Sequence, residues 1–287
     1  MVLYISDINR CAFLREQAEW AGVHVLGLQE TRASYESPGD SNFMRIIATA
    51  SEGQGGSELW LSRTRAFATV GGQPLLFDRN HIHVGVAMPE LPIVRYEASG
   101  LRLSFVVAHA PHSGHPAQHI DEWWKRLKEQ IGRFCLNTQS IILIDANADV
   151  QEEAPFTGEL LHTNREKPRV GDRALMALLR QHSLWAPSSF SAYHDGQTST
   201  WTANDATKTA RSDFVLLPLE WWGFDIKSCN IHELDSGVGG LDHVAVGVTV
   251  RGWFQPTSGS FRKAPTTTST GLLSTRYTEK KIKCSAF

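Results

Sequence analysis

The sequence has no long hydrophobic run. Its most apolar stretch, residues 214–224, is only eleven residues long and contains Glu220, whereas a membrane-spanning helix needs about 20 apolar residues. No apolar segment near the N-terminus is long enough for a secretory signal peptide. The sequence therefore predicts an intracellular protein without a membrane span, located in the nucleus or the cytoplasm.

Cysteine is scarce. The four cysteines, Cys11, Cys135, Cys229 and Cys284, are scattered along the chain. They form no CxxC pair and no Cys/His spacing typical of a zinc site. We expect reduced thiols and neither a disulfide framework nor a zinc centre.

Net charge is also nearly absent, but the total of −2 hides an asymmetry. Residues 1–250 hold 21 basic and 29 acidic residues, a net charge of −8. Residues 251–287 hold seven basic residues against Glu279, a net charge of +6. Binding of polyanions through a broad basic surface is therefore disfavoured for the main body. A nuclease whose carboxylates hold a metal remains compatible with this charge.

The chain is organised as one large folded region followed by a segment of different composition. Its 287 residues, 41% hydrophobic and 20% charged, suit a globular protein with a substantial core. Beyond residue 250 the sequence becomes rich in Pro, Thr and Ser, which is linker composition. We predict a domain over residues 1–252 and a basic low-complexity tail or linker over residues 253–287.

Apolar patterning predicts strands mixed with a few helices. Short runs rich in Val, Ile and Leu, each next to polar residues, predict buried strands at residues 23–28, 103–108, 141–144, 214–217 and 244–250. Helical spacing of apolar residues predicts a helix over residues 120–134 and shorter ones over residues 10–20 and 172–181. Residues 43–50 and 57–63 are typical of a hairpin. Without regular βαβ alternation, we expect sheets packed together with helices outside.

Polar residues follow several of the predicted strands. Asp145 and Asn147 come directly after one apolar run, and residues two apart in a strand point to the same side. A carboxylate binds a metal or accepts a proton from water, and an amide holds a phosphate oxygen. Asp and Asn are also common in ordinary turns after a strand. On this pair alone, the turn interpretation is favoured.

Two further strands begin with acidic residues. Asp213 opens one strand, and Asp242 with His243 opens the next. Asp and His are the residue types of an oriented general base, in which the carboxylate fixes the imidazole tautomer. Taken singly, each is equally an ordinary residue at a strand entry.

Glu30 and His109 also follow predicted strands. Glu30 offers an oxygen ligand for a hard cation. His109 would serve as a phosphate donor or leaving-group acid, or as a hydrogen-bonded loop histidine. Neither residue is decisive alone.

The order of these groups is more specific than any one of them. The set resembles the endonuclease/exonuclease/phosphatase superfamily, a group of Mg²⁺-dependent phosphodiesterases and phosphatases. This resemblance implies an α+β, DNase I-like fold: a four-layer α/β/β/α sandwich of two mostly antiparallel sheets flanked by helices. The ordered set of residues that carries this resemblance is Glu30, His109, Asp145-x-Asn147, Thr200-Trp201, Asp213 and Asp242-His243.

Within the superfamily, the sequence Leu26-Gly-Leu-Gln-Glu-Thr-Arg32 most resembles the corresponding segment in the endonuclease domain of non-LTR retrotransposons. In such elements a linker leads to a reverse transcriptase. The resemblance therefore implies a DNA substrate and a place within a longer polyprotein.

The resemblance also implies roles for single residues. Glu30 would be the principal ligand of Mg²⁺, or Mn²⁺, with Asp242 contributing to the metal site. Asp145 would activate the attacking water, and Asn147 would orient the phosphate.

The remaining roles complete the expected site. Asp213 would pair with His243, and His109 would be a further catalytic residue. Arg32 and Arg211 are the expected substrate contacts.

One departure from the family pattern separates three hypotheses. The family has a metal-site Asn at the end of its first strand, but residues 1–5 contain none and Asn9 lies too close to Glu30. The leading hypothesis is a Mg²⁺-dependent endonuclease that nicks DNA, with a first strand truncated in this chain. The alternatives are a phosphatase or phospholipase acting on small or lipid phosphates, and a catalytically impaired retroelement remnant.

Overall fold

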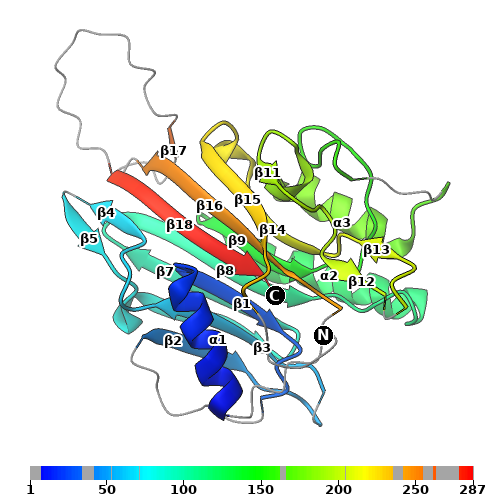
Figure 1. The fold of residues 1–287 in the computed structure, drawn as a ribbon, viewed down its shortest axis with the longest axis horizontal. Helices are drawn as coiled ribbons and strands as arrows, with labels where there is room; N and C mark the ends of the chain where they lie inside the picture. Colours follow the sequence, from blue (N-terminus) through cyan, green and yellow to red (C-terminus); the bar gives the residue numbers. More distant parts are fainter. Residues whose placement is uncertain are drawn as a thin grey trace, which may run out of the picture.

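The protein is described by a computed structural model, shown in Figure 1. It covers residues 8–33, 42–52, 54–70, 72–161, 166–203, 205–234, 242–254, 261–262 and 278–286. The α-helices are α1 (Ile8–Trp20), α2 (Ala117–Phe134) and α3 (Val170–Gln181). Short 3₁₀ helices occupy Arg79–His81, Pro187–Ser189 and Leu219–Trp221.

The strands fall into two large sheets and one short pair. The larger sheet has the order β11-β15-β16-β18-β1-β3-β2, with β17 beside β16, and β4 joining β18 to β5. Its strands are β1 (Val25–Gln29), β2 (Phe43–Ala48), β3 (Ser57–Ser62), β4 (Ala68–Val70), β5 (Gln73–Leu75), β11 (His194–Asp195), β15 (Asp225–Ile231), β16 (Ala245–Phe254), β17 (Phe261–Arg262) and β18 (Thr278–Ala286).

The smaller sheet has the order β10-β14-β9-β8-β7-β6, and β12 pairs with β13 separately. The strands of these two groups are β6 (Ile82–Met88), β7 (Leu91–Ala98), β8 (Leu101–His109), β9 (Gln139–Asp145), β10 (Leu184–Trp185), β12 (Trp201–Thr202), β13 (Thr209–Ala210) and β14 (Asp213–Pro218).

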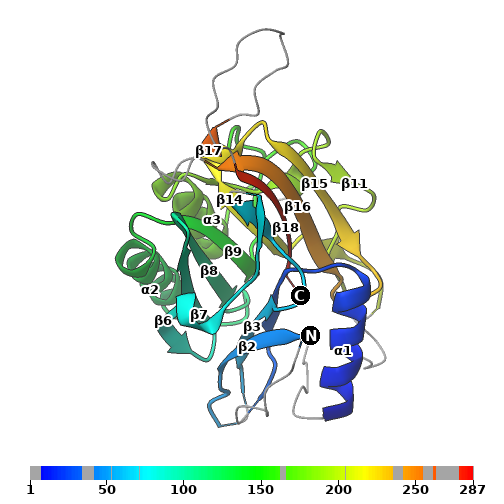
Figure 2. The same cartoon turned by 90° about the vertical axis from the view of Figure 1, so that its left-hand side faces the viewer.

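The elements stack in four layers, as Figure 2 shows. The two sheets pack face to face, with α2 and α3 outside the smaller sheet and α1 outside the larger one. One hydrophobic core lies between the sheets and one lies beneath each helical layer. The expected α+β, four-layer α/β/β/α sandwich is confirmed.

The helices form where apolar spacing predicted them. The buried face of α2 contains Ile120, Trp123, Trp124, Leu127 and Ile131, the i, i+3, i+4 pattern of a helix packed on one side. The shorter predicted helices correspond to α1 and α3. No helix within the described residues is long and apolar enough to cross a membrane.

The predicted strands also form, and one glycine sets how closely the sheets approach. The five apolar runs correspond to β1, β8, β9, β14 and β16, and the predicted hairpin corresponds to β2 and β3. A Cβ atom on Gly27 of β1 would lie 2.8 Å from Leu143 Cβ and 3.2 Å from Val107 Cγ2. Real Cβ contacts do not come that close, so β1 packs against β9 and β8 only because residue 27 is glycine.

Part of the expected tail belongs to the larger sheet. Residues 278–286 form β18, which pairs with β16 in antiparallel and with β1 in parallel orientation. The segment is too poor in apolar residues to fold alone, but its backbone finds hydrogen-bonding partners on both sides in a sheet that already exists. For this segment the structure differs from the expected boundary at residue 252. The division into domain and linker otherwise stays a prediction.

Candidate active site

Three predicted site residues lie in a row at one edge of the smaller sheet. In the parallel pairing of β8 with β9, His109 lies opposite Asp145. In the antiparallel pairing of β9 with β14, Asp145 lies opposite Asp213. Directly opposed residues in neighbouring strands share a face. The strand register therefore gathers groups that are far apart in the sequence.

The larger sheet brings two more residues to the same place. Glu30 directly follows β1, and its Oε1 lies 3.8 Å from His109 Nε2. His243 precedes β16, and its Nδ1 lies 2.9 Å from Asp213 Oδ2. Facing ends of the two packed sheets thus form one cluster of Glu30, His109, Asp145, Asp213 and His243, which we call the catalytic cluster.

Asp213 and His243 form an ion pair, and hydrogen bonds of Thr200 and Ser212 hold Asp213 in place. The Thr200 Oγ1 accepts hydrogen bonds from the backbone N–H groups of Ser212 and Asp213, each at 3.1 Å. The Ser212 hydroxyl donates to Asp213 Oδ2 at 2.9 Å. These contacts fix the carboxylate that orients His243.

The pKa values of Asp213 and His243 are shifted so that both members of the pair are charged at neutral pH. Burial alone would raise the pKa of Asp213, but the charge of His243 and hydrogen bonds from His243, Thr200 and Ser212 outweigh it and lower that pKa. Burial would likewise lower the pKa of His243, but the charge and hydrogen bond of Asp213 raise it to about 9. At neutral pH the imidazole is therefore protonated against an ionised carboxylate.

Asp145 has the opposite character. Its side chain is buried, and its Oδ1 accepts the Asn147 backbone N–H at 3.1 Å. Burial, followed by repulsion from Asp213, raises its pKa to about 7. A carboxylate poised near neutral pH suits a general base.

His109 lies between two acidic residues. Its Nε2 is 3.7 Å from Asp145 Oδ2 as well as 3.8 Å from Glu30 Oε1, beyond direct hydrogen-bond distance in each case. Burial lowers its pKa, and the charge of Glu30 opposes that effect. His109 is thus a neutral imidazole at pH 7, able to donate or accept a hydrogen bond.

The donor set fits a divalent cation. Ligand atoms of Asp145, Asp213 and His243 lie within 4.8 Å of one another, and Glu30 adds a carboxylate beside His109. Because Asp213 is already paired with His243, Glu30 offers the oxygens suited to a hard cation, and the Asp145 carboxylate adds negative charge beside the same imidazole. Burial and the charge of Asp213 raise the pKa of Asp145, and a bound cation would offset this unfavourable negative charge.

Asn147 and Asp242 are held beside the catalytic cluster by backbone contacts. The Asn147 Nδ2 donates to the Ala110 carbonyl at 2.8 Å, and its φ of 44° marks a sharp turn after β9. The Asp242 carbonyl accepts the Thr202 N–H at 2.7 Å. The phosphate-orienting role of Asn147 and the metal role of Asp242 stay predictions.

The two predicted substrate contacts differ in exposure. Arg32 is half-buried. Its backbone N–H donates to the Gly55 carbonyl at 2.9 Å, and its φ of 51° turns the chain away from β1. Arg211 is only 7% exposed, and its Nη2 lies 3.1 Å from His194 Nε2. Burial lowers the pKa of Arg211 to about 10. This guanidinium is enclosed by protein, so its role in substrate binding stays a prediction that the geometry does not favour.

Sequence reasoning missed groups on both sides of the catalytic cluster. It placed Thr200-Trp201 in the ordered set but gave Thr200 no role, although a hydroxyl ahead of Arg211-Ser212-Asp213 was the available signal. It also passed over a hollow of about 300 Å³ lined by Asn147, His115, Arg169 and Arg173. No local pattern marks those last three residues: His115 precedes α2, whereas Arg169 and Arg173 lie at the start of α3.

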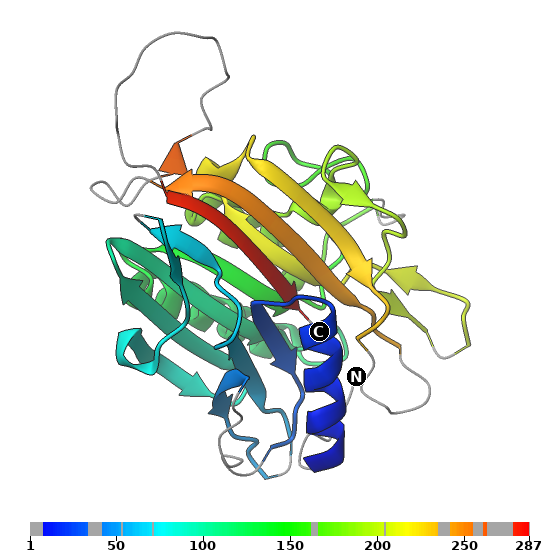
Figure 3. The same cartoon turned by 60° about the vertical axis from the view of Figure 1, so that its left-hand side comes forward.

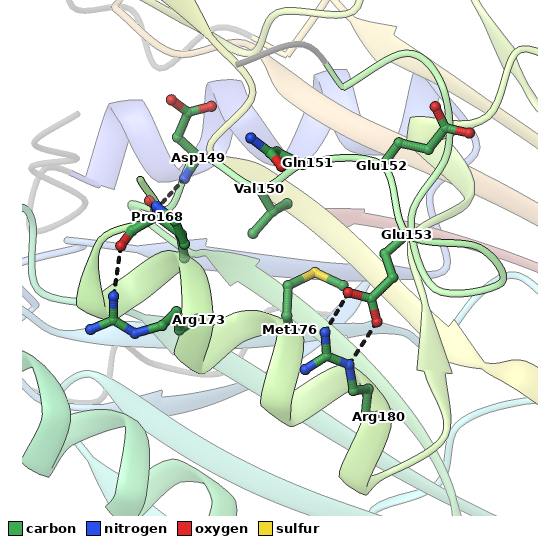
Figure 4. Close-up of a pocket in the computed structure, with 10 residues that line it drawn as sticks. Asp149, Val150, Gln151, Glu152, Glu153, Pro168, Arg173, Met176 and Arg180 are labelled. Carbon is green, nitrogen blue, oxygen red and sulfur yellow. Dashed lines mark hydrogen bonds and ion pairs between the residues drawn. The ribbon is translucent and has the colours of Figure 1, made fainter. Parts of the chain in front are cut away.

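A neighbouring pocket of about 380 Å³, shown in Figure 4, is a different feature. Arg180 forms a two-pronged ion pair with Glu153 there. Arg173 Nη1 donates to the Pro168 carbonyl at 2.7 Å, and the Asp149 N–H donates to Asp172 Oδ1 at 2.8 Å. Arg180 and Glu153 thus neutralise each other, and no member of the catalytic cluster lines the pocket.

The first-strand Asn expected from the resemblance finds no described counterpart. Residues 1–5 lie outside the described part of the chain. Asn9 belongs to α1, not to a strand. The support that this Asn gives the metal in related proteins is therefore not assigned to any described residue.

Comparisons bear on the fold. No family profile and no curated protein sequence matches this chain. The catalytic domain of Xenopus laevis APE2 superposes with a TM-score of 0.58 at 14% identity, covering 90% of this chain and 91% of that one. The 3′ phosphatase NExo from Neisseria, bound to a product DNA hairpin, gives 0.57 at 13% identity over 84% and 93%. The endonuclease domain of TRAS1, a telomere-specific non-LTR retrotransposon, gives 0.52 at 15% identity over 83% and 90%. This chain therefore has the DNase I-like fold of the endonuclease/exonuclease/phosphatase superfamily.

Proposed function

We propose that this protein is a Mg²⁺-dependent phosphodiesterase that nicks one strand of DNA. The observation that carries the proposal is the catalytic cluster: a charged Asp213–His243 pair beside a buried carboxylate poised near neutral pH. Two observations support DNA as the substrate. The sequence around Glu30 resembles that of retrotransposon endonucleases, and the fold is shared with DNA-acting enzymes. A place in an intracellular polyprotein with a reverse transcriptase is part of the same proposal.

Asp145 is the group that takes the proton of the attacking water. Its pKa of about 7 leaves it partly ionised at neutral pH while keeping it basic enough to accept a proton. Glu30, with a contribution from Asp242, would hold Mg²⁺ or Mn²⁺. When bound, such an ion polarises the phosphoryl oxygens and stabilises the charge that develops on them.

His243 is protonated and presents a positive charge to the scissile phosphate. Asp213 keeps the ring in place through the 2.9 Å contact at Nδ1, so Nε2 carries the other N–H. A preorganised cationic donor of this kind stabilises a charged transition state at little reorganisation cost. The neutral His109 and the Asn147 amide add donors that need not change protonation.

The hollow beside Asn147 suits the phosphates that flank the cleaved bond. It is lined by the cationic side chains of Arg169 and Arg173 and by His115. Arg169 is partly engaged by Asp172 at 3.5 Å, so attraction to DNA should be moderate. Binding of this kind weakens as salt rises, because it releases counterions from the phosphates.

Nicking of supercoiled plasmid tests the proposal. We expect Mg²⁺-dependent conversion to open circles, abolished by EDTA and reduced at least about 10²-fold in Asp145→Ala and His243→Ala, since a positioned acid or base contributes about 10² to 10⁴ in rate. Matched controls are Glu129→Ala and His83→Ala, which remove an exposed acid and an exposed imidazole away from the catalytic cluster. Full activity in either cluster variant, or in EDTA, would refute the proposal.

A second candidate is removal of a terminal phosphate from DNA. One protein with this fold, from Neisseria, is a 3′ phosphatase, and the acidic body fits a small reacting group better than a long polyanion. An oligonucleotide with a 3′ phosphate separates the two activities. Release of inorganic phosphate without internal cleavage would favour the phosphatase, and neither product at millimolar metal would favour an inactive remnant.

A further inference from the structure

The outer face of the larger sheet is bare over residues 225–229 of β15 and at Arg251 of β16. Figures 1 and 3 show α1 lying over β1 and its neighbours, and its core reaches Ile231 and Ala245 at the opposite ends of β15 and β16. Asp225, Lys227 and Cys229 are exposed along β15, and Ile226 and Ser228 between them are buried. One face of β15 therefore packs inward and the other meets solvent.

A cleft of about 510 Å³ lies where this bare face meets the end of α1. Its walls include Gly22, which follows α1, and Arg65, which precedes β4. Its floor includes Lys227 of β15 and Arg251 of β16. The cleft thus joins segments from four distant parts of the sequence.

The cleft is more basic than the body around it. Of its four charged residues, Arg65, Lys227 and Arg251 are cationic and only Asp225 is anionic. Asp225 is paired with Arg251 at 3.4 Å, and within the described residues Lys227 has no ion-pair partner. Two of the three cations, Arg65 and Lys227, belong to residues 1–250, whose net charge is −8.

The sheet continues the basic row beyond the cleft. In the pairing of β16 with β18, position 281 lies opposite Arg251 and position 283 lies opposite Thr249. Both of these β18 positions are lysines. Basic residues therefore occur on β15, β16 and β18 next to the cleft.

An exposed indole stands beside the same cleft. Trp20 ends α1 and directly precedes Ala21 and Gly22, which line it. Its side chain is 77% exposed, while Trp60, Trp124, Trp185 and Trp221 are fully buried. A single exposed aromatic ring is common on protein surfaces, so the significance of Trp20 lies in its position next to the basic cleft. Aromatic rings next to basic grooves are where single-stranded nucleic acids stack their bases.

We propose that this cleft is a second nucleic-acid site, which binds a single-stranded segment with a base stacked on Trp20 and its phosphates on Arg65 and Lys227. Thr249 follows His243 by six residues along an extended chain, which places the cleft about 20 Å from the catalytic cluster. The inference rests on the proposed nuclease function, because it assigns this site to an unpaired part of the same substrate.

Fluorescence anisotropy with a labelled single-stranded 12-mer tests the site in the 287-residue protein. We expect Trp20→Ala to weaken binding about tenfold, and Trp20→Phe to keep most of the affinity because it retains a stacking ring. Lys227→Glu should weaken binding and make it less dependent on salt. Lys125→Glu, an exposed change on α2 on the opposite side of the molecule, is the charge-matched control.

The outcomes separate this inference from the proposed function. Wild-type affinity in both Trp20→Ala and Lys227→Glu, or equal weakening by Lys125→Glu, would overturn it. So would binding to anionic lipid vesicles without binding to the oligonucleotide. Nicking of a short duplex should be unchanged in Trp20→Ala and Lys227→Glu. If the protein binds the 12-mer through Trp20 but nicks nothing, the inference stands and the proposed function fails.

Discussion

Thr200 supports the catalytic cluster without any titratable group of its own. Its hydroxyl oxygen accepts two backbone N–H groups at the start of β14 and is almost fully buried. From the sequence alone, Thr200 had no role beyond its place beside Trp201 in the ordered set. What makes this residue important is the return of the chain to it at Ser212 and Asp213.

Thr200→Val should separate that support from mere packing. The change keeps the shape of the side chain but leaves two buried N–H groups without an acceptor, which costs about 1–3 kcal/mol per group. We expect lower stability, lower kcat with little change in KM, and a fall in the pKa of His243 measured by NMR titration. Thr200→Ser should retain all three properties, and equal behaviour of the two variants would contradict this role.

His243 predicts how stability depends on pH in the metal-free protein. Its pKa rises from 6.5 to about 9 on folding, so its stabilising contribution is complete below pH 6.5 and is lost as pH rises through 9. Asp145, with a pKa raised to about 7, lowers stability between about pH 4 and 7 and adds no further change above that range. The fall between pH 7 and 9 therefore reports on His243.

We expect the free energy of unfolding in EDTA to fall by about 2–3 kcal/mol between pH 7 and 9. Urea unfolding followed by circular dichroism at several pH values measures it. The fall should disappear in His243→Asn and persist in the exposed variant His83→Asn. A flat profile in the wild-type protein would show that the imidazole is not held by Asp213.

Among the strands, β18 has the most consequential position. It separates β1, which ends just before Glu30, from β16, which begins just after His243. Its nine paired positions with β16 and three with β1 make it a central strand. The two halves of the catalytic cluster in the larger sheet are therefore held at their spacing by a segment from the far end of the sequence.

Deleting residues 278–286 should consequently lower both stability and nicking. β1 and β16 would each lose a hydrogen-bonded neighbour and expose a strand edge. We expect a lower melting temperature and loss of activity, both partly restored by adding a peptide of sequence 276–287 in trans. A scrambled peptide is the control. Unchanged melting and activity after the deletion would show that β18 is dispensable.

The molecule as a whole carries its negative charge partly in the catalytic cluster. Glu30, Asp145 and Asp213 converge there and His243 balances only one of them. The raised pKa of Asp145 expresses the free-energy cost of this arrangement without a cation. A bound divalent ion should therefore stabilise the entire fold, since a ligand that binds only the native state shifts the unfolding equilibrium.

Thermal unfolding with and without Mg²⁺ or Mn²⁺ tests this charge balance. At metal concentrations about 100 times Kd, the stabilisation should be about 2.7 kcal/mol, a rise of several degrees in Tm that EDTA reverses. Asp145→Asn should lose most of the rise. In EDTA above pH 7, however, it should melt at or above the wild-type temperature, because it removes a buried negative charge. Equal metal-induced shifts in both proteins would place the cation elsewhere.

Most of the secondary structure and the identity of the polar groups at strand ends could be read from local patterns. Apolar runs and helical spacing are properties of neighbouring residues, so they predicted α2, β9 and β14 without knowledge of the fold. The ordered set from Glu30 to His243 likewise led to the DNase I-like sandwich.

Only the tertiary structure determines which of the polar residues at strand ends lie next to one another. Register between β9 and β14 sets Asp145 opposite Asp213, and burial then raises one pKa while a paired imidazole lowers the other. The insertion of β18 and the basic cleft beside Trp20 also join distant segments. Hydrogen-bond pairing, burial and electrostatic coupling act between residues that are close in space but far apart in the chain. Local sequence patterns therefore do not predict which of these residues become neighbours.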